Sequence, residues 1–168
     1  MTAERTALPS GRGFFPTPSP GAPTELSVAP AMEASIEVTA SDTRILFEEA
    51  ATALIWHVAP REAGAPACWW ENVRLDGRDV ADLAGRWLDR IIDIGTEQGK
   101  AVSGVIVDAI AEPDPEVGGT RWRLRARIGL RPFGPDGPPS RRVRSTSDRP
   151  LTLETTGRSL TLRARLAV

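Results

Sequence analysis

The pattern of hydrophobic and polar positions predicts two strands and two helices in the first half of the chain. Alternation over SIEVTA (35–40) predicts a half-buried strand. From about Arg44 to Ala59, apolar residues recur at three- and four-residue spacing, which predicts a helix that ends before a proline. The stretch WWENVRL (69–75) alternates again and leads into a turn. A second helix is predicted to begin at Asp79, with the clearest apolar stripe in the chain: Val80, Leu83, Ala84, Trp87, Leu88, Ile91 and Ile92.

The second half of the pattern predicts four strands. They are AVSGVIVDAIA (101–111), TRWRLRARIGLR (120–131), LTLET (151–155) and SLTLRARLAV (159–168). The complete order is β-α-β-α-β-β-β-β, which predicts an α+β fold with two helices packed on one mixed or antiparallel sheet.

The first 29 residues differ from the rest of the chain. The run PSGRGFFPTPSPGAPTE is rich in Pro, Gly, Ser and Thr and has no apolar period, so burial could not offset the cost of ordering it. We therefore expect a disordered tail over 1–29 and one compact domain over 30–168, a length that suits a single core.

Three features of the sequence bear on the cellular compartment. The N-terminus lacks the long apolar core of a signal peptide, and no window approaches the roughly 18 apolar residues of a membrane span. The single cysteine, Cys68, excludes an internal disulfide and fits a reducing compartment. We expect a cytoplasmic protein.

Charge is distributed unequally along the chain. Residues 1–119 contain 9 basic and 19 acidic residues, whereas residues 120–168 contain 12 basic and 3 acidic ones. Much of the excess lies on alternate positions of two predicted strands, at Arg121, Arg123, Arg125, Arg127, Arg163 and Arg165. If these strands are neighbours, they form one basic face that suits phosphates of RNA or another polyanion. The alternatives are a plain solvated face and neutralisation by the acidic half.

Few residues are candidates for catalysis. His57 is the only histidine, which excludes a zinc site built from several imidazoles. We favour a structural role for it over an acid–base pair with Asp93 or Glu49. No Walker loop, dinucleotide fingerprint or serine nucleophile elbow is present. No nucleophile, base and orienting group can be assembled, so a stand-alone enzyme is the least supported class.

The cysteine and the tryptophans are expected in the core. Cys68 stands beside two tryptophans and is predicted to be a small core residue. Core or half-buried positions are also predicted for Trp56, Trp69, Trp87 and Trp122. The alternative for Trp70 is an exposed position from which it would stack on a base or a partner side chain.

Three segments resemble the archease family. They are IEV-x-A-x(5)-LFEEAATAL (36–54), DVADLAGRWLDRIID (79–93) and RWRLRARIGL (121–130), and the resemblance covers about residues 30–168. The resemblance implies a small cytosolic accessory protein of the RNA ligase that joins tRNA halves. Such a protein promotes nucleotidyl transfer to the ligase in tRNA splicing and uses a bound metal ion such as calcium.

The resemblance also implies positions for the metal site. The family's His-Thr-Ala-Asp motif falls on residues 30–33, so Glu33 stands where the family has its aspartate. The family's penultimate acid falls on Ala167, and its terminal backbone oxygen falls on Val168. A basic residue of the family maps onto Arg144, and the Thr-Tyr pair that follows it becomes Ser147 and Asp148.

The departures from the family pattern weaken the predicted metal site. Ca²⁺ or Mg²⁺ requires six or more oxygen ligands, several of them charged. Glu33 and the Val168 terminus alone would hold such an ion poorly, and Asp148 would have to replace a missing oxygen. Two functions therefore stay open, an accessory protein of an RNA ligase and a metal-free binding module of the same fold with another partner.

Overall fold

The computed structural model describes residues 33–139, 143 and 151–167. Its elements follow in the predicted order, with one added 3₁₀ turn. They are β1 Glu33–Ala40, α1 Thr43–Val58, β2 Trp69–Gly77, α2 Val80–Glu97, β3 Ala101–Ala111, η1 Pro115–Val117, β4 Trp122–Arg131, β5 Thr152–Thr156 and β6 Ser159–Ala167. The expected Pro/Gly-rich tail over 1–29 lies outside the described residues, so it stays a prediction.

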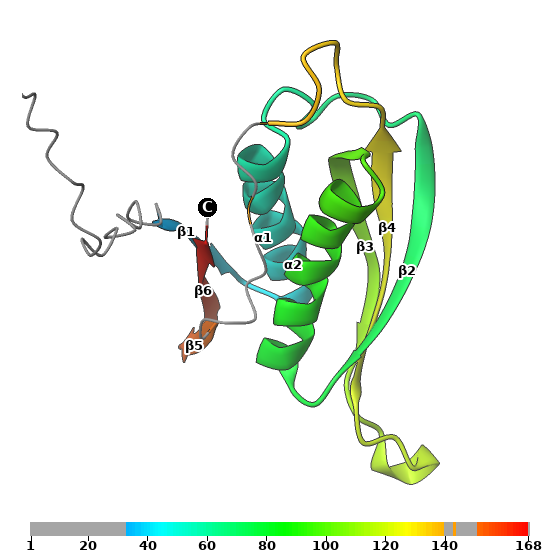
Figure 1. Ribbon diagram of the computed structural model, residues 1–168. Helices are drawn as coiled ribbons and strands as arrows, with labels where there is room; N and C mark the ends of the chain where they lie inside the picture. Colours follow the sequence, from blue (N-terminus) through cyan, green and yellow to red (C-terminus); the bar gives the residue numbers. More distant parts are fainter. Residues whose placement is uncertain (1–32, 140–142, 144–150, 168) are drawn as a thin grey trace, which may run out of the picture.

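The strands form two antiparallel sheets rather than the one sheet expected from the sequence. One sheet has the order β1-β6-β5 and the other has the order β2-β4-β3. Both helices contact strands of both sheets, so they form a layer between them (Figure 1). The expected α+β class with two helices is confirmed, and the apolar face of each sheet packs on the same pair of helices.

Aspartates fix the beginning of both helices. The Asp42 carboxylate accepts a hydrogen bond from the Ile45 amide at 2.9 Å, and the Asp79 carboxylate accepts one from the Asp82 amide at 2.7 Å. Each carboxylate satisfies an amide that has no partner inside its helix. The start of α2 is also close to the end of β2, because a Cβ atom at Gly77 would lie 2.7 Å from the Leu83 amide nitrogen. Any larger residue at Gly77 would therefore force strand and helix apart.

One continuous core joins the helices to both sheets. Its largest fully buried side chains include Trp87 and Phe47. The Trp87 indole N–H donates to the Phe47 carbonyl oxygen at 3.1 Å, which ties α2 to α1 and satisfies the polar atom of a buried ring. The apolar stripe predicted for α2 is confirmed, since Leu83, Ala84, Trp87, Leu88, Ile91 and Ile92 are all buried.

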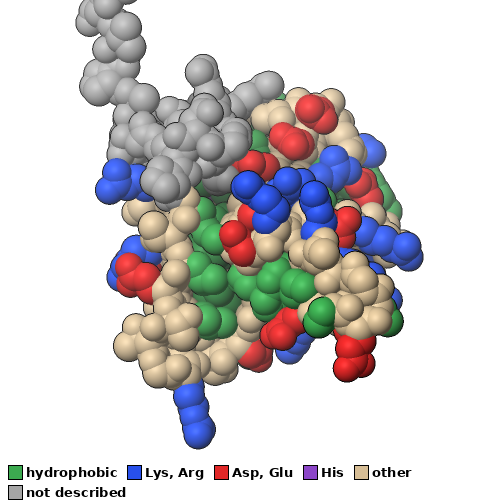
Figure 2. Space-filling view, turned by 90° about the horizontal axis from the view of Figure 1, so that it is seen from below, with side chains coloured by type: hydrophobic (Ala, Val, Ile, Leu, Met, Phe, Trp, Pro, Cys, Tyr) green, Lys and Arg blue, Asp and Glu red, His purple; other side chains and the backbone are tan. Residues whose placement is uncertain are grey.

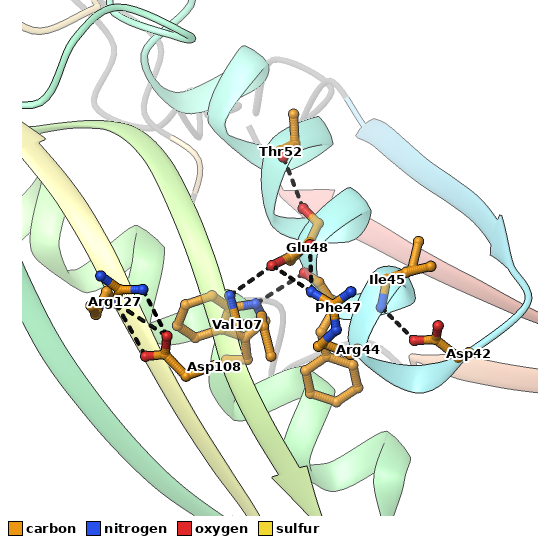
Figure 3. A network of polar contacts seen from close by, with 10 residues as sticks. Asp42, Arg44, Ile45, Phe47, Glu48, Thr52, Val107, Asp108 and Arg127 are labelled. Carbon is orange, nitrogen blue, oxygen red and sulfur yellow. Dashed lines mark hydrogen bonds and ion pairs between the residues drawn. The ribbon is translucent and has the colours of Figure 1, made fainter.

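Helix α1 seals an irregular part of strand β3 (Figure 3). The β3–β4 register shifts between Val107 and Ala109. There the Glu48 carboxylate of α1 accepts a hydrogen bond from the Val107 amide at 2.9 Å, and Arg44 pairs with the same carboxylate at 3.4 Å. The Glu48 side chain therefore supplies the hydrogen-bond partner that the Val107 amide of this edge strand would otherwise lack.

Two loops at one end of the molecule are held together by charged side chains. Glu62 is buried, and its carboxylate accepts a hydrogen bond from the Gly134 amide at 3.0 Å. Arg61 forms an ion pair with Asp136 across the same two loops. These contacts fix the segment after β4 against the segment after α1.

One face of the molecule mixes both signs of charge. The face seen from below has hydrophobic side chains near its centre, with Lys, Arg, Asp and Glu side chains around them (Figure 2). Among the described residues, no helix is long and apolar enough to cross a membrane.

Candidate functional site

The β1–β6 ladder brings the two ends of the predicted metal site near each other along the backbone. Glu33 is the first residue of β1 and is paired with Ala167, the last residue of β6. Paired residues in an antiparallel ladder have Cα atoms roughly 4.5–5.5 Å apart. Val168 and Asp148 lie outside the described residues, so their part in a metal site stays a prediction.

The donor set around this pair does not match a tightly held hard cation. The residue opposite Glu33 is alanine, which supplies no side-chain oxygen. Within the described ranges, no group of three or more His, Cys, Asp or Glu residues is placed to hold a metal ion. A site for Ca²⁺ with six or more oxygens cannot be built from Glu33 and one chain terminus alone.

The arginines predicted to form one basic face are divided between the two sheets. Arg123, Arg125 and Arg127 lie on β4, and Arg121 directly precedes that strand. Arg163 and Arg165 lie on β6. Among the described strands, β4 pairs only with β2 and β3, and β6 only with β1 and β5, so the two sets are not neighbours. The joint basic face does not form, and Arg144 lies outside the described residues.

Carboxylates neutralise one arginine of each sheet. Arg127 donates to both oxygens of Asp108, the nearer at 2.8 Å (Figure 3). Arg163 lies between two carboxylates, with its Nε 3.0 Å from Glu37 and its guanidinium 2.9 Å from Glu154. The hydrogen bond that Arg163 donates to Glu37, together with the charges of Glu154 and Glu37, raises the pKa of Arg163. These two arginines are thus paired within the protein.

A different trio is left without such partners. Arg123 and Arg125 are exposed on the face of the β2-β4-β3 sheet that points away from the helices, and Arg74 of β2 is paired directly with Arg125. No ion pair or hydrogen bond within the described part of the chain involves the side chain of any of the three. Like charges directly opposite each other in a ladder repel.

Arg74 was missed by the analysis of the sequence. Its alternation with Asn72 and Asp76 places it on the polar side of β2, but a single arginine in a strand gives no signal. Only the register, which sets it against Arg125, makes it part of a cluster.

Three tryptophans and the cysteine are exposed, against the prediction of core positions. Trp56 is 56% exposed, Trp69 38% and Trp70 47%, whereas Trp87 is fully buried and Trp122 is partly buried. Cys68 is exposed too, because it stands before β2, where its backbone amide bonds the Leu130 carbonyl oxygen at 2.8 Å. The core prediction is therefore wrong for Trp56, Trp69 and Cys68. Of the two alternatives for Trp70, the exposed position is the one observed.

The remaining acid–base candidates lie apart from the arginine trio. His57 is exposed in the last turn of α1, where a positive charge is favourable at the C-terminal end of a helix. Asp93 is partly buried near the end of α2. Desolvation, followed by the charges of Glu97 and Asp89, raises the pKa of Asp93. At the other end of α2, the Arg78 backbone amide lowers the pKa of Asp82. Both pKa shifts are explained by local surroundings on α2, burial and like charges for Asp93 and the helix N-terminus for Asp82.

Comparison with known proteins concerns the fold. No family model matches the chain, and no curated protein matches its sequence. The solution structure of protein 1598 from Methanobacterium thermoautotrophicum is similar with a TM-score of 0.60 and 17% identity, over 81% of this chain and 92% of that one. An archease from Thermotoga maritima, described as a "possible chaperone", is similar with a TM-score of 0.47 and 13% identity, over 80% of this chain and 90% of that one.

The two similarities differ in weight. A TM-score of 0.47 is too low to support an argument, and 17% identity shows a common fold and nothing finer. The chain therefore shares the α+β fold of protein 1598, in agreement with the archease-like fold that its sequence resembles.

Proposed function

We propose that the protein is a non-catalytic accessory protein that binds an RNA ligase of the tRNA-splicing type and promotes its nucleotidylation. The archease resemblance implies this function, and the shared fold supports an accessory role. The observation that carries the proposal is the β1–β6 register, which sets Glu33 against the end of β6. An archease-like site needs these two distant segments to be adjacent.

The proposed action does not depend on a resident metal ion. Because the residue opposite Glu33 is Ala167, the site lacks the acid that the family pattern has there. A hard cation bound by Glu33 and the Val168 carboxylate would be held weakly and would exchange with solvent. The protein would then act mainly through its contact with the ligase.

The experiment is a nucleotidylation assay with the purified ligase of the same genome. Labelled nucleotide incorporated into the ligase is measured with and without this protein, each with added Mn²⁺, Mg²⁺ or Ca²⁺. A faster reaction that needs this protein supports the accessory role. A ligase whose rate does not change, together with no complex in size-exclusion chromatography, contradicts it.

The second candidate is a metal-free binding module with another partner, and Ala167 is the observation that favours it. Calorimetry with Ca²⁺, Mg²⁺ and Mn²⁺, combined with the ligase assay, separates the two. Binding in the micromolar range that is lost in Glu33→Ala, with an unchanged thermal transition, argues against a metal-free module. No heat of binding, combined with no effect on the ligase, leaves the module as the better description.

A further inference from the structure

The outer face of the β2-β4-β3 sheet is open and basic. We use "outer face" for the side away from the helices, occupied by Trp70, Asn72, Arg74 and Asp76 of β2 and Arg123, Arg125 and Arg127 of β4. Both helices lie on the opposite side of this sheet (Figure 1), and the loop before β2 reaches the outer face only at its Gly129 end, where Ala67 lies next to Gly129. Side chains on it are therefore accessible.

Two adjoining hollows run along the outer face. One has a volume of about 550 Å³ and is lined by Arg74, Leu75, Asp76, Ala109, Ala111, Arg123, Leu124 and Arg125. The other, of about 290 Å³, extends it past Asn72 and Asp108. Arg74 and Arg125 line both hollows, so they stand where the two meet. An elongated depression of this kind suits a linear ligand.

The small residues of β3 make room for that ligand. Ala109 is paired with Arg125 and Ala111 with Arg123, so the long side chains of β4 have only methyl groups beside them on this edge. On the other side, Arg125 faces Arg74, and Arg123 faces Asp76. Three arginines and one aspartate leave an excess of two positive charges in the larger hollow.

Repulsion between Arg74 and Arg125 favours an anion between them. Directly opposed like charges in a ladder are destabilising, with Cβ atoms about 5 Å apart. No carboxylate of the described residues forms an ion pair with either one, in contrast to Arg127 and its partner Asp108. A phosphate that bonds both guanidinium groups would replace this repulsion with two charge-assisted contacts.

An exposed aromatic ring lies on the same face. Trp70 is paired with Gly129, and a Cβ atom on that glycine would come within 3.2 Å of the Trp70 ring. The indole therefore lies over the central strand, in space that only glycine leaves free. Four residues of strand, or about 13 Å, separate Trp70 from Arg74 along β2. An exposed indole at this distance from a phosphate-binding pair is suited to stack on a base.

We propose that the outer face binds single-stranded RNA, with phosphates on Arg74, Arg125 and Arg123 and a base stacked on Trp70. Charge alone would fit an acidic peptide equally well, but a peptide of that kind gives Trp70 nothing planar to stack on. The proposal needs neither the ligase nor a metal ion, so it is independent of the function proposed above.

The test is fluorescence anisotropy with a labelled oligouridylate of about 12 nucleotides, a length within the range of single-strand sites. Affinity is measured between about 50 and 200 mM salt in the presence of a chelator. Three phosphate contacts predict a slope of about −2 in log K against log salt. No binding at the lowest salt overturns the proposal.

Two substitutions separate the phosphate contacts from the stacking contact. Arg125→Ala should weaken binding and make the slope shallower by about 0.7, since one counterion release is lost. Trp70→Ala should weaken binding about tenfold with an unchanged slope, because stacking is insensitive to salt. Equal slopes for wild type and Arg125→Ala would contradict the assignment of the phosphates.

The matched control is Arg165→Ala. Arg165 is an exposed arginine on the other sheet, opposite Ser35 in the β1–β6 ladder. Its substitution by alanine changes the net charge by the same amount as Arg125→Ala. Its affinity and slope should equal those of the wild type. A loss equal to that of Arg125→Ala would show that only total charge matters, which overturns the site.

Competitors test the identity of the ligand. Unlabelled oligouridylate should displace the probe, whereas polyglutamate of the same charge, uridine monophosphate and duplex RNA should displace it at least tenfold less well. Equal competition by polyglutamate would show a plain polyanion surface. Equal competition by the mononucleotide would show a single-phosphate site. Equal competition by duplex would show that no unstacked base is required.

Discussion

The central strands of the two sheets contain the same tetrapeptide, but its first arginine has different neighbours in each sheet. Leu124-Arg125-Ala126-Arg127 lies on β4 and Leu162-Arg163-Ala164-Arg165 lies on β6. In both, the leucine and the alanine are buried and an arginine between them faces outward. On β6, Arg163 has Glu37 on one neighbouring strand and Glu154 on the other. On β4, Arg125 has Arg74 on one side and Ala109 on the other.

The comparison shows that neighbours decide what an arginine stripe does. On the β6 face, flanking carboxylates hold Arg163 in two ion pairs, and Thr39 and Thr161 are hydrogen-bonded across the strands at 2.9 Å. Flanking arginine and alanine leave the β4 face with an unpaired charge and a depression. Arg125 therefore keeps a charge that is available for a partner, whereas the charge of Arg163 is already paired.

The largest effect is expected in the layer that both sheets share. Trp87→Ala should lower the free energy of unfolding by about 3–5 kcal/mol, since it leaves a cavity between α1 and α2. If the sheets are one cooperative unit, tryptophan fluorescence and far-UV circular dichroism should show coincident denaturant transitions.

The control for that measurement is Trp56→Ala. Trp56 lies on the exposed side of α1, so its loss should change the free energy of unfolding by no more than about 0.5 kcal/mol. Two separate transitions in Trp87→Ala would show that the sheets unfold independently.

Reversing one charge should make the β4 face resemble the β6 face. Arg74→Glu places a carboxylate opposite Arg125, which replaces repulsion by attraction and should stabilise the fold by roughly 0.2–1 kcal/mol. The same change should weaken oligouridylate binding more than tenfold. Greater stability with less binding, measured by thermal unfolding and anisotropy, would be the sign of a functional charge cluster. Lower stability would show that Arg74 has a structural role.

The converse change should make the β6 face resemble the β4 face. Glu37→Gln with Glu154→Gln removes both partners of Arg163 and should return its raised pKa toward the ordinary value. The variant should bind oligouridylate several-fold better at low salt, with a slope steeper by about 0.7 for one added phosphate contact. Unchanged binding would mean that charge beside a hollow, such as the one lined by Arg163 and Arg165, is insufficient without an aromatic ring.

The smallest effects are expected for two carboxylates of α2, the helix layer between the sheets. Their contributions to stability change with pH in opposite directions. The pKa of Asp93 is raised above 3.8, so folding favours its protonated form. The stabilising contribution of the protonated carboxyl group is fully present below pH 3.8 and is lost as pH rises through the folded-state pKa. Asp93→Asn should therefore increase the melting temperature at pH 7, by an amount that disappears in acid.

Asp82 provides the matched contrast on the same helix. Its pKa is lowered below 3.8 by the Arg78 amide, so its stabilising contribution is present above pH 3.8 and is lost as pH falls through the folded-state pKa. Asp82→Asn should decrease the melting temperature at pH 7. Melting temperatures of both variants from pH 3 to 7, compared with wild type, check both signs at once. A shift of the same sign for the two would contradict them.

The sequence by itself determined the elements and their apolar faces. Periodicity placed α2 and its buried stripe correctly, because the spacing of Leu83, Trp87 and Ile91 is a local property that any core would use. The start of α2 at Asp79 was predicted for the same reason, since capping depends on residues only three positions away. Those predictions needed no knowledge of long-range contacts.

The tertiary structure decided which strands are neighbours, and with that the chemistry of the surface. The division into two sheets separated arginines that the sequence suggested might act together, and register alone joined Arg74 to Arg125. The position of the Trp70 ring depends likewise on Gly129 of another strand, since a side chain there would collide with it. Local periodicity shows which side of a strand is polar, but cross-strand electrostatics depends on pairing between residues far apart in the chain.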